Sequence, residues 1–196
     1  AITVTTKDPK TNVVTLAQAI AADRVVPAKD VPLPTNVSRG NTKTAIAAAG
    51  KNTFTGTFDL GYQYHLHMEN HVCYVEPRED KLEVHVATQM PIGVQGQIAS
   101  TTGRQAAHIV VNTKRCGGGY GGKITNSMLT AAVAGFCADR LDLPVKVELD
   151  MQKTMKTLGC RGGKHFEYTV AWDADGAITA LEGKVYLACG AVPDDN

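Results

Sequence analysis

The spacing of apolar residues along the chain predicts three helices. They combine apolar positions at helical spacing with residues that begin or end helices, and they cover residues 15–22, 91–102 and 126–141. Pro91 suits a first helical turn, and Gly103 suits the left-handed position after a last turn. The third helix ends before Pro144 and has a broad apolar face of the kind that packs on a core. That face comprises Met128, Leu129, Ala132, Val133, Phe136 and Cys137.

Alternating or β-branched runs predict strands between these helices. They cover residues 53–60, 71–75, 81–87, 108–113, 145–149, 165–172 and 177–188. In the first, Phe54 and Phe58 share one face and threonines share the other. The last two flank residues 173–176 and predict a hairpin, in which Gly176 adopts a positive φ at little cost. The mixed order of elements favours an α+β fold with a mixed sheet and packed helices.

The first forty residues differ from the rest of the chain. Pro27, Pro32, Pro34 and Gly40 interrupt a segment that can be neither a long helix nor a central strand. We therefore expect residues 1–42 to be the end of one domain with a linker, and residues 43–196 to be the first part of the next. Because the first residue is Ala1, we expect a processed or truncated part of a longer protein.

Composition narrows the classes of partner. The 196 residues carry a net charge of +1, with 43% hydrophobic and 20% charged residues, which is typical of a soluble globular protein. This balance predicts neither nucleic acid nor a membrane as partner, and no apolar run approaches the roughly 20 residues that span a bilayer. Five widely spaced cysteines without a CxxC pair argue against iron–sulfur or structural zinc ligation within this stretch. We expect free thiols and a cytoplasmic location.

The most informative stretch is a glycine-rich loop at residues 117–122. Five of its six positions are glycine, between a predicted strand and a predicted helix. Backbone N–H groups in such a loop can approach a ligand closely, and the following helix start adds about half a positive charge. A phosphate-binding GxxxxGK[ST] motif fails because Ile124 replaces the hydroxyl residue, and a GxGxxG match lacks a suitable acidic partner. An anionic or oxygen-bearing ligand and a purely structural tight turn both remain open.

Four blocks of this chain resemble the molybdenum hydroxylases, the family of the aldehyde oxidases and xanthine dehydrogenases. In order, they are residues 61–69 (GYQYHLHME), 82–89 (LEVHVATQ), 114–123 (KRCGGGYGGK) and 143–150 (LPVKVELD). The resemblance covers about residues 45–190, with a weaker similarity before that to the end of a hammerhead-type domain. It implies that the chain is part of a molybdopterin-binding domain.

The resemblance also implies roles for individual residues. Gln89 matches a glutamine whose amide hydrogen-bonds an oxygen ligand of the molybdenum, and Tyr120 takes the place of an aromatic ring beside the metal. Both would stand next to the metal's own ligands rather than bind the metal itself. The backbone of Gly118, Gly119, Tyr120 and Gly121 would contact the cofactor. From the residues alone, Gln89 can equally be an ordinary polar strand end, and Tyr120 a core aromatic that caps the loop.

Ile124 bears on the substrate. In the family, xanthine-type members carry a glutamate after GGK, whereas aldehyde-oxidase-type members carry an apolar residue. Ile124 therefore favours aldehydes or apolar N-heterocycles over a polar purine. The alternative is that Ile124 belongs to the helix core and faces no substrate.

Other chemistry-bearing side chains have competing interpretations. His65, His67 and His71 could form a metal site, but a structural role is favoured. Lys123 and Arg115 could neutralise a cofactor phosphate or be solvated loop cations. Cys116 is expected to be a core thiol rather than a nucleophile.

The resemblance implies a hydroxylase that takes oxygen from water and uses a molybdenum–molybdopterin cofactor. The full-length protein is expected to use 2Fe-2S clusters and FAD as well, and to be a homodimer. The general-base glutamate is expected downstream, so no catalytic residue is assigned here, and we expect this chain alone to be inactive and to lose the cofactor. The alternatives are a xanthine dehydrogenase-type purine hydroxylase, and a non-catalytic protein that binds a ligand or a partner through the loop.

Overall fold

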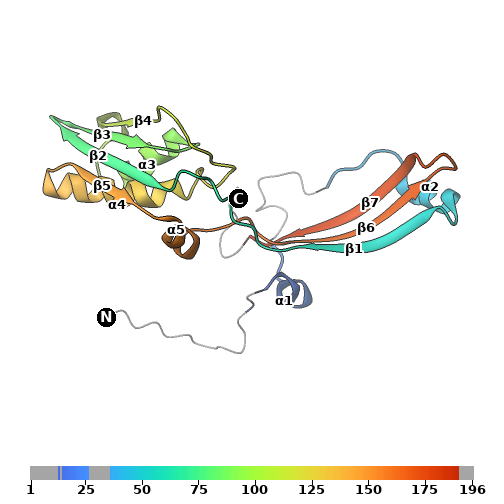
Figure 1. Ribbon diagram of the computed structural model, residues 1–196. Coiled ribbons are helices and arrows are strands. Elements are labelled where there is room, and N and C mark those ends of the chain that lie inside the picture. The colour runs from blue at the N-terminus through green and yellow to red at the C-terminus, as the bar shows by residue number, and fades with distance from the viewer. Residues whose placement is uncertain (1–12, 14, 27–35, 190–196) are drawn as a thin grey trace. The chain divides into compact units, whose positions relative to one another are not determined.

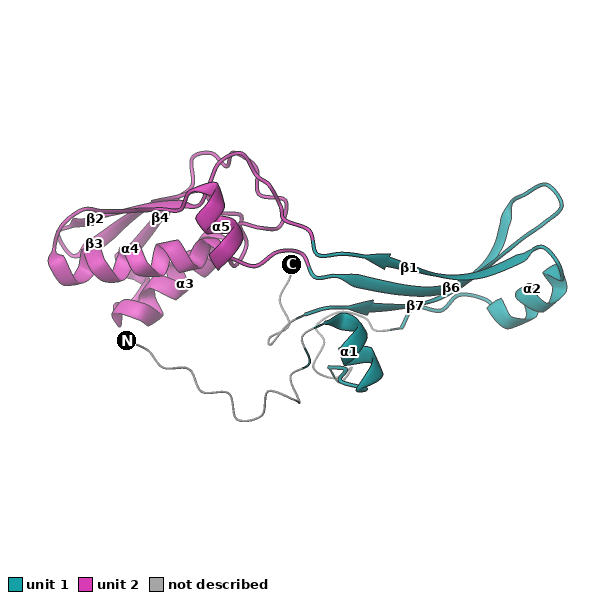
Figure 2. Ribbon diagram, turned by 60° about the horizontal axis from the view of Figure 1, so that its bottom comes forward, with its two compact units in different colours: residues 1–62, 162–193 teal, residues 63–161, 194–196 magenta. Residues whose placement is uncertain are grey.

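The computed structural model describes residues 13, 15–26 and 36–189 (Figure 1). The chain divides into two compact units, which Figure 2 colours separately. Among the described residues, unit 1 combines those up to Tyr62 with those from Gly162 onward, and unit 2 comprises those from Gln63 to Arg161. The expected domain boundary at residue 42 and the hammerhead-type segment stay predictions. Pro27, Pro32 and Pro34 lie outside the described residues.

Unit 1 contains an antiparallel sheet in the order β1-β6-β7. Its strands are β1 (Thr53–Leu60), β6 (Lys164–Trp172) and β7 (Ile178–Leu187). The predicted strands and hairpin are confirmed, and Gly176 has a φ of 84° in the turn. Phe54 lies beside Tyr168, whereas the hydroxyls of Thr55 and Thr169 hydrogen-bond across the strands at 2.9 Å. The phenylalanine and threonine faces of β1 are therefore as expected.

Two short helices complete the described part of unit 1. Helix α1 (Leu16–Ala21) starts with a capping box in which Thr15 and Gln18 exchange hydrogen bonds, and it confirms the predicted helix. Helix α2 (Thr42–Ala49) was not predicted, although the Asn41 side chain caps it by accepting from the Thr44 N–H at 3.1 Å.

Unit 2 contains a four-stranded mixed sheet in the order β4-β3-β2-β5. The strands are β2 (Val72–Arg78), β3 (Lys81–Val86), β4 (Ile109–Asn112) and β5 (Val145–Glu148). Strands β3 and β4 are parallel, and the other neighbouring pairs are antiparallel. The predicted strands and the mixed α+β class are confirmed.

Helices α3 (Pro91–Thr102) and α4 (Ser127–Leu141) pack against one face of this sheet (Figures 1 and 2). A 3-10 turn (Ala106–His108) leads into β4, and the short α5 (Met151–Thr157) follows β5. Gly103 ends α3 in the left-handed conformation, as expected. The common core is made of buried side chains from both layers: Cys73, Val75, Leu82, Val84, Val86, Val94, Ile98, Ile109, Ala131, Ala134 and Ala138.

The apolar face predicted for α4 is wrong except at Met128, which packs against the core. Helix α4 buries its small residues, which are Ser127, Thr130, Ala131, Ala134, Gly135 and Ala138. Leu129, Val133 and Phe136 are instead 50%, 47% and 41% exposed. The small residues face the core because they let α4 approach its neighbours closely. At Gly135 the approach is so close that a Cβ would lie 2.9 Å from Ile98.

No helix in the described ranges is both long and apolar enough to cross a membrane.

Candidate functional site

The glycine loop joins β4 to α4 within unit 2 and has an unusual backbone conformation. Gly118, Tyr120 and Gly121 have φ values of 95°, 53° and 90°. Glycine adopts positive φ readily, but Tyr120 does so at a conformational cost. Its side chain is 61% exposed, so burial of the ring does not stabilise this conformation. The contacts around the loop must therefore stabilise it, which is common at ligand-binding sites.

The other three glycines of the loop allow close contacts with this chain's own side chains. A Cβ on Gly119 would lie 2.4 Å from Gln89 Oε1, one on Gly117 would lie 2.6 Å from Glu69, and one on Gly122 would lie 2.6 Å from His65. All five glycines thus have a structural reason within unit 2. What the loop offers a ligand is decided by the groups that it leaves free.

Gln89 is bound to the loop by three hydrogen bonds. Its N–H donates to the Lys123 carbonyl at 2.9 Å, and its Oε1 accepts from the N–H groups of Gly121 at 3.1 Å and Lys123 at 3.2 Å. Because both groups facing Oε1 are donors, the amide nitrogen must point the other way. Gln89 is exposed, and its Nε2 makes no hydrogen bond to any described residue. An N–H donor is therefore held at the surface in a fixed orientation.

The structure brings Gln89 and Gly121 together, but the Gly121 N–H donates to Gln89 itself and not to a ligand. The Gly121 N–H is occupied by Gln89, whereas the Tyr120 N–H makes no hydrogen bond within the described residues. Within the described residues, the N–H groups of Gly118 and Gly119 make no hydrogen bond either. Gln89 Nε2 and these three backbone N–H groups fit an oxygen-bearing ligand, since each offers a hydrogen and no charge.

Glu69 holds both ends of the loop. Its Oε2 accepts from the Gly117 N–H at 2.8 Å and from Lys123 Nζ at 2.6 Å, and its own N–H donates to the Gly117 carbonyl at 3.2 Å. Burial favours the neutral acid, but the hydrogen bonds from Lys123 and Gly117 outweigh it and hold the pKa of Glu69 below its usual value. A carboxylate therefore links residues 117 and 123 across the loop.

Lys123 fits neither of its two expected roles. Its side chain is fully buried and paired with Glu69, so it is neither a solvated cation nor free to neutralise a phosphate. The Lys123 side chain instead pairs with a carboxylate within unit 2. Arg115 is exposed, at a depression that Lys114, His85 and Asn112 also line.

Arg161 contacts the loop, although nothing in the sequence indicated this contact. Its guanidinium donates to the Tyr120 carbonyl at 2.7 Å and to Gln63 Oε1 at 3.3 Å. The peptide group between Tyr120 and Gly121 is therefore held at both ends: Arg161 binds its carbonyl oxygen, and Gln89 binds its N–H. An isolated arginine after a cysteine carries no sequence signal for such a role.

The remaining candidates have varied outcomes. Ile124 is half-buried, and its N–H donates to the Gly121 carbonyl at 3.2 Å, so it directly follows the site along the chain. Cys116 is exposed, so the expectation of a core thiol is wrong at this position. Cys73 is instead the buried thiol, and burial raises its pKa to about 12.

The three histidines are structural neighbours of the loop. His67 Nδ1 lies 2.6 Å from the Glu69 carbonyl oxygen, and the His67 and His71 rings meet edge to face at 4.9 Å. In the described part of the chain, no three His, Cys, Asp or Glu side chains are grouped so as to hold a metal ion.

Comparison with known proteins identifies relatives over most of the chain. It is 36% identical over 179 residues to a xanthine dehydrogenase of Drosophila pseudoobscura pseudoobscura. The matched residues make up 91% of this chain and 13% of the relative. It is 33% identical to the indole-3-acetaldehyde oxidase of Arabidopsis thaliana, over 78% of this chain and 12% of that protein. The chain therefore spans about an eighth of the length of these relatives.

Solved structures share the fold. The aldehyde oxidoreductase of Desulfovibrio gigas matches 76% of this chain with 16% of its own, at a TM-score of 0.64 and 22% sequence identity. The quinoline 2-oxidoreductase of Pseudomonas putida 86 matches 76% of this chain with 19% of its own, at a TM-score of 0.61 and 24% identity.

The model of the molybdopterin cofactor-binding domain matches residues 26–196, which include the loop, Gln89 and Glu69. The chain belongs to the molybdopterin cofactor-binding domain family.

Proposed function

We propose that this chain supplies one wall of the cofactor site in a larger molybdenum hydroxylase, which oxidises aldehydes or N-heterocycles with water as the oxygen source. The observation that carries the proposal is the orientation of Gln89. Two loop N–H groups hold its carbonyl oxygen, and its amide nitrogen remains free at the surface. A neutral donor held in this way can polarise an oxygen on a metal without adding charge.

The chain's own residues would bind and orient the cofactor. Gln89 Nε2 and the Tyr120 N–H would donate to its oxygen atoms, and the backbone of Gly118, Gly119 and Gly121 would lie against it. The Tyr120 ring, which is exposed here, would cover one side of the substrate slot and exclude water. The bound cofactor would supply the two-electron redox chemistry, and the general-base glutamate, the 2Fe-2S clusters and FAD are expected elsewhere in the full-length protein.

Ile124 supports an apolar substrate. It directly follows the residue whose N–H binds Gln89, and it offers no charge or hydrogen bond to a polar purine. The purine-hydroxylase alternative is supported by the 36% identical xanthine dehydrogenase, so the substrate has to be tested. A homodimer in the cytoplasm is the assembly and location we propose for the full-length protein.

Gln89→Ala in the full-length protein tests this assignment. We expect its turnover of a benzaldehyde-type substrate to fall about 10–100-fold, because a neighbouring donor to a metal ligand is lost. Gln97→Ala is the matched control, since Gln97 lies on α3 and bonds only within that helix. Molybdenum content measured in the same samples separates lost cofactor from lost chemistry. Wild-type turnover by Gln89→Ala would contradict the role of Gln89, and a molybdenum-free native protein would favour the non-catalytic alternative.

A separate measurement tests the proposed class of substrate. Turnover of benzaldehyde and of xanthine is compared for the unmodified full-length protein, and we expect benzaldehyde to be preferred. Preference for xanthine would show that Ile124 does not determine the substrate class.

A further inference from the structure

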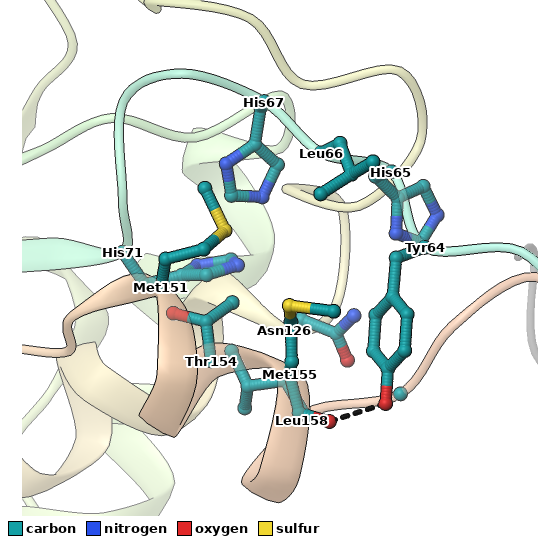
Figure 3. A pocket seen from close by; sticks show the side chains of 11 residues that line it. Tyr64, His65, Leu66, His67, His71, Asn126, Met151, Thr154, Met155 and Leu158 are labelled. Carbon is teal, nitrogen blue, oxygen red and sulfur yellow. Dashed lines mark hydrogen bonds between the residues drawn. The ribbon is translucent and has the colours of Figure 1, made fainter.

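A small cavity lies inside unit 2, between α5, the segment from Tyr64 to His71, and the start of α4 (Figure 3). Its volume is about 20 Å³. About 10–15 Å³ is enough to hold one water molecule, and such a site also needs two to four polar partners. A cavity of this volume has room for one water molecule.

Besides His65 Nε2, whose ring lies against Gly121 and Gly122 of the loop, two buried polar atoms of residues that line this cavity have no hydrogen-bond partner among the described residues. They are His71 Nδ1 and Thr154 Oγ1. His71 is only 2% exposed and Thr154 only 8%, so bulk water does not serve them. In Figure 3 the His71 ring and the Thr154 side chain lie next to each other at the cavity. Folded proteins leave few such atoms unpaired, because the hydrogen bonds that they made to water in the unfolded chain are then lost.

A third polar group faces the same space. Asn126 lines the cavity, and its carboxamide makes no capping bond to α4 and no other hydrogen bond within the described residues. The carboxamide offers both donors and an acceptor, and the threonine hydroxyl offers one of each. The cavity thus has mixed hydrogen-bonding capacity.

Charge argues against an ion in this cavity. Its described lining holds no carboxylate, ammonium or guanidinium group. Burial, followed by the effects of His67, Lys123 and His65, lowers the pKa of His71 to about 4, so the ring is neutral near pH 7. A cation would find no counter-charge here and would be repelled by the Lys123 ammonium. The remaining ligand is small and neutral, and it both donates and accepts.

We propose that this cavity binds one ordered water molecule, which hydrogen-bonds His71 Nδ1 and Thr154 Oγ1, with the Asn126 carboxamide as its third partner. The water connects α5 to the segments that support the glycine loop. Asn126 starts α4 directly after the loop, and His67 Cβ lies 3.2 Å from the place of a Cβ on Gly118. The site is independent of the proposed cofactor.

The direction of the stability change in Thr154→Val tests the proposal. Valine keeps the shape and the β-branching of threonine but removes the hydroxyl. With a bound water, the substitution deprives that water and His71 of a partner, and we expect the unfolding equilibrium constant to rise about tenfold. In an empty cavity, the substitution removes an unpaired buried hydroxyl, and the constant falls. Native-state hydrogen exchange at the amides of unit 2, on the 196-residue chain, measures this constant.

Thr157→Val is the matched control on the same helix. Thr157 is exposed and its hydroxyl donates to the Lys153 carbonyl at 2.7 Å, so its replacement should change the constant less than about twofold. A constant for Thr154→Val that falls, or that changes no more than the control, overturns the proposal.

A second measurement needs no substitution. In the unmodified chain, cross-relaxation between water and the protons of His71 and Thr154 should show a long-lived buried water. Its absence overturns the proposal even if the Thr154→Val chain fails to fold.

Discussion

The Glu69 carboxylate neutralises a fully buried ammonium and accepts an N–H from the first glycine of the loop. Sequence alone identified Glu69 only through a family block, and it assigned Lys123 to a solvated or phosphate-binding role. The pairing could not be predicted, because residues 69 and 123 are far apart in the chain and only the fold brings them together. The structure places Gln89, on which a block of similar sequence ends, beside the loop, and its role toward a molybdenum ligand stays a prediction.

Replacement of Glu69 should destabilise unit 2. In Glu69→Gln, Lys123 stays buried without a counter-charge, which costs about 3–5 kcal/mol for a fully buried pair. The Glu69 side chain is 36% exposed, so we expect a smaller loss, about 2–3 kcal/mol, in urea unfolding. Glu76→Gln is the control, because Glu76 pairs with an exposed arginine and should cost less than about 1 kcal/mol. Equal losses for the two variants would show that the buried pair has no special weight.

The lowered pKa of His71 should make unit 2 less stable as the pH falls. Its pKa in the folded chain is about 4, below the usual value of 6.5, because it is buried and lies near His67, Lys123 and His65. The unfolded chain then binds more protons between these two values, so stability falls as the pH drops from about 6.5 to about 4. The difference between these two pKa values corresponds to about 3 kcal/mol of stability.

The free energy of unfolding, measured from pH 7 to pH 4, checks this dependence. His71→Gln should flatten the curve in this range, and part of the slope should remain because the pKa of His65 is lowered too. Unchanged slopes in the variant would rule out His71 as the titrating group.

At the scale of the element, regular patterns were predictive and short capped segments were not. The strands and the helices at residues 91–102 and 127–141 follow from apolar spacing and from Pro91 and Gly103. The short helices α2 and α5 were missed, although Asn41 and Asp150 cap them through their side chains. The buried face of α4 was misassigned because hydrophobicity ranks leucine and phenylalanine above alanine, whereas close packing against α3 and the sheet requires small residues.

Two glycine substitutions should therefore have opposite effects. In Gly135→Ala, the new Cβ would lie 2.9 Å from Ile98 within the core, and overpacking typically costs about 1–3 kcal/mol, more than the helix gains. In Gly96→Ala, the new Cβ on α3 meets no atom within 4 Å, so helix propensity should add about 0.5–1 kcal/mol. Thermal unfolding of both variants measures the difference, and a stabilised Gly135→Ala would show that α3 and α4 are not tightly packed at this point.

At the scale of the whole molecule, the chain's order and its spatial units do not coincide. Unit 1 is assembled from two segments that flank unit 2 in the sequence, because β1 pairs with β6 and β6 with β7. A composition change near residue 42 cannot reveal such a discontinuous unit, since it depends on strand pairing over more than 100 residues. The family blocks could be recognised without knowledge of the fold, because each block is local in the sequence, and the cofactor contacts of their residues stay predictions.

The last prediction concerns cofactor retention by the 196-residue chain. The free donors of the loop and of Gln89 are all neutral: they are Gln89 Nε2 and the N–H groups of Gly118, Gly119 and Tyr120, whereas the buried Lys123 can supply no charge to a phosphate. So few contacts cannot repay the loss of translational and rotational freedom on binding. We therefore expect the chain, purified from cells that make the cofactor, to contain less than about a tenth of an equivalent of molybdenum by elemental analysis. The full-length protein, purified in parallel, should contain close to one equivalent. A stoichiometric content in the short chain would mean that residues 1–196 form the greater part of the site.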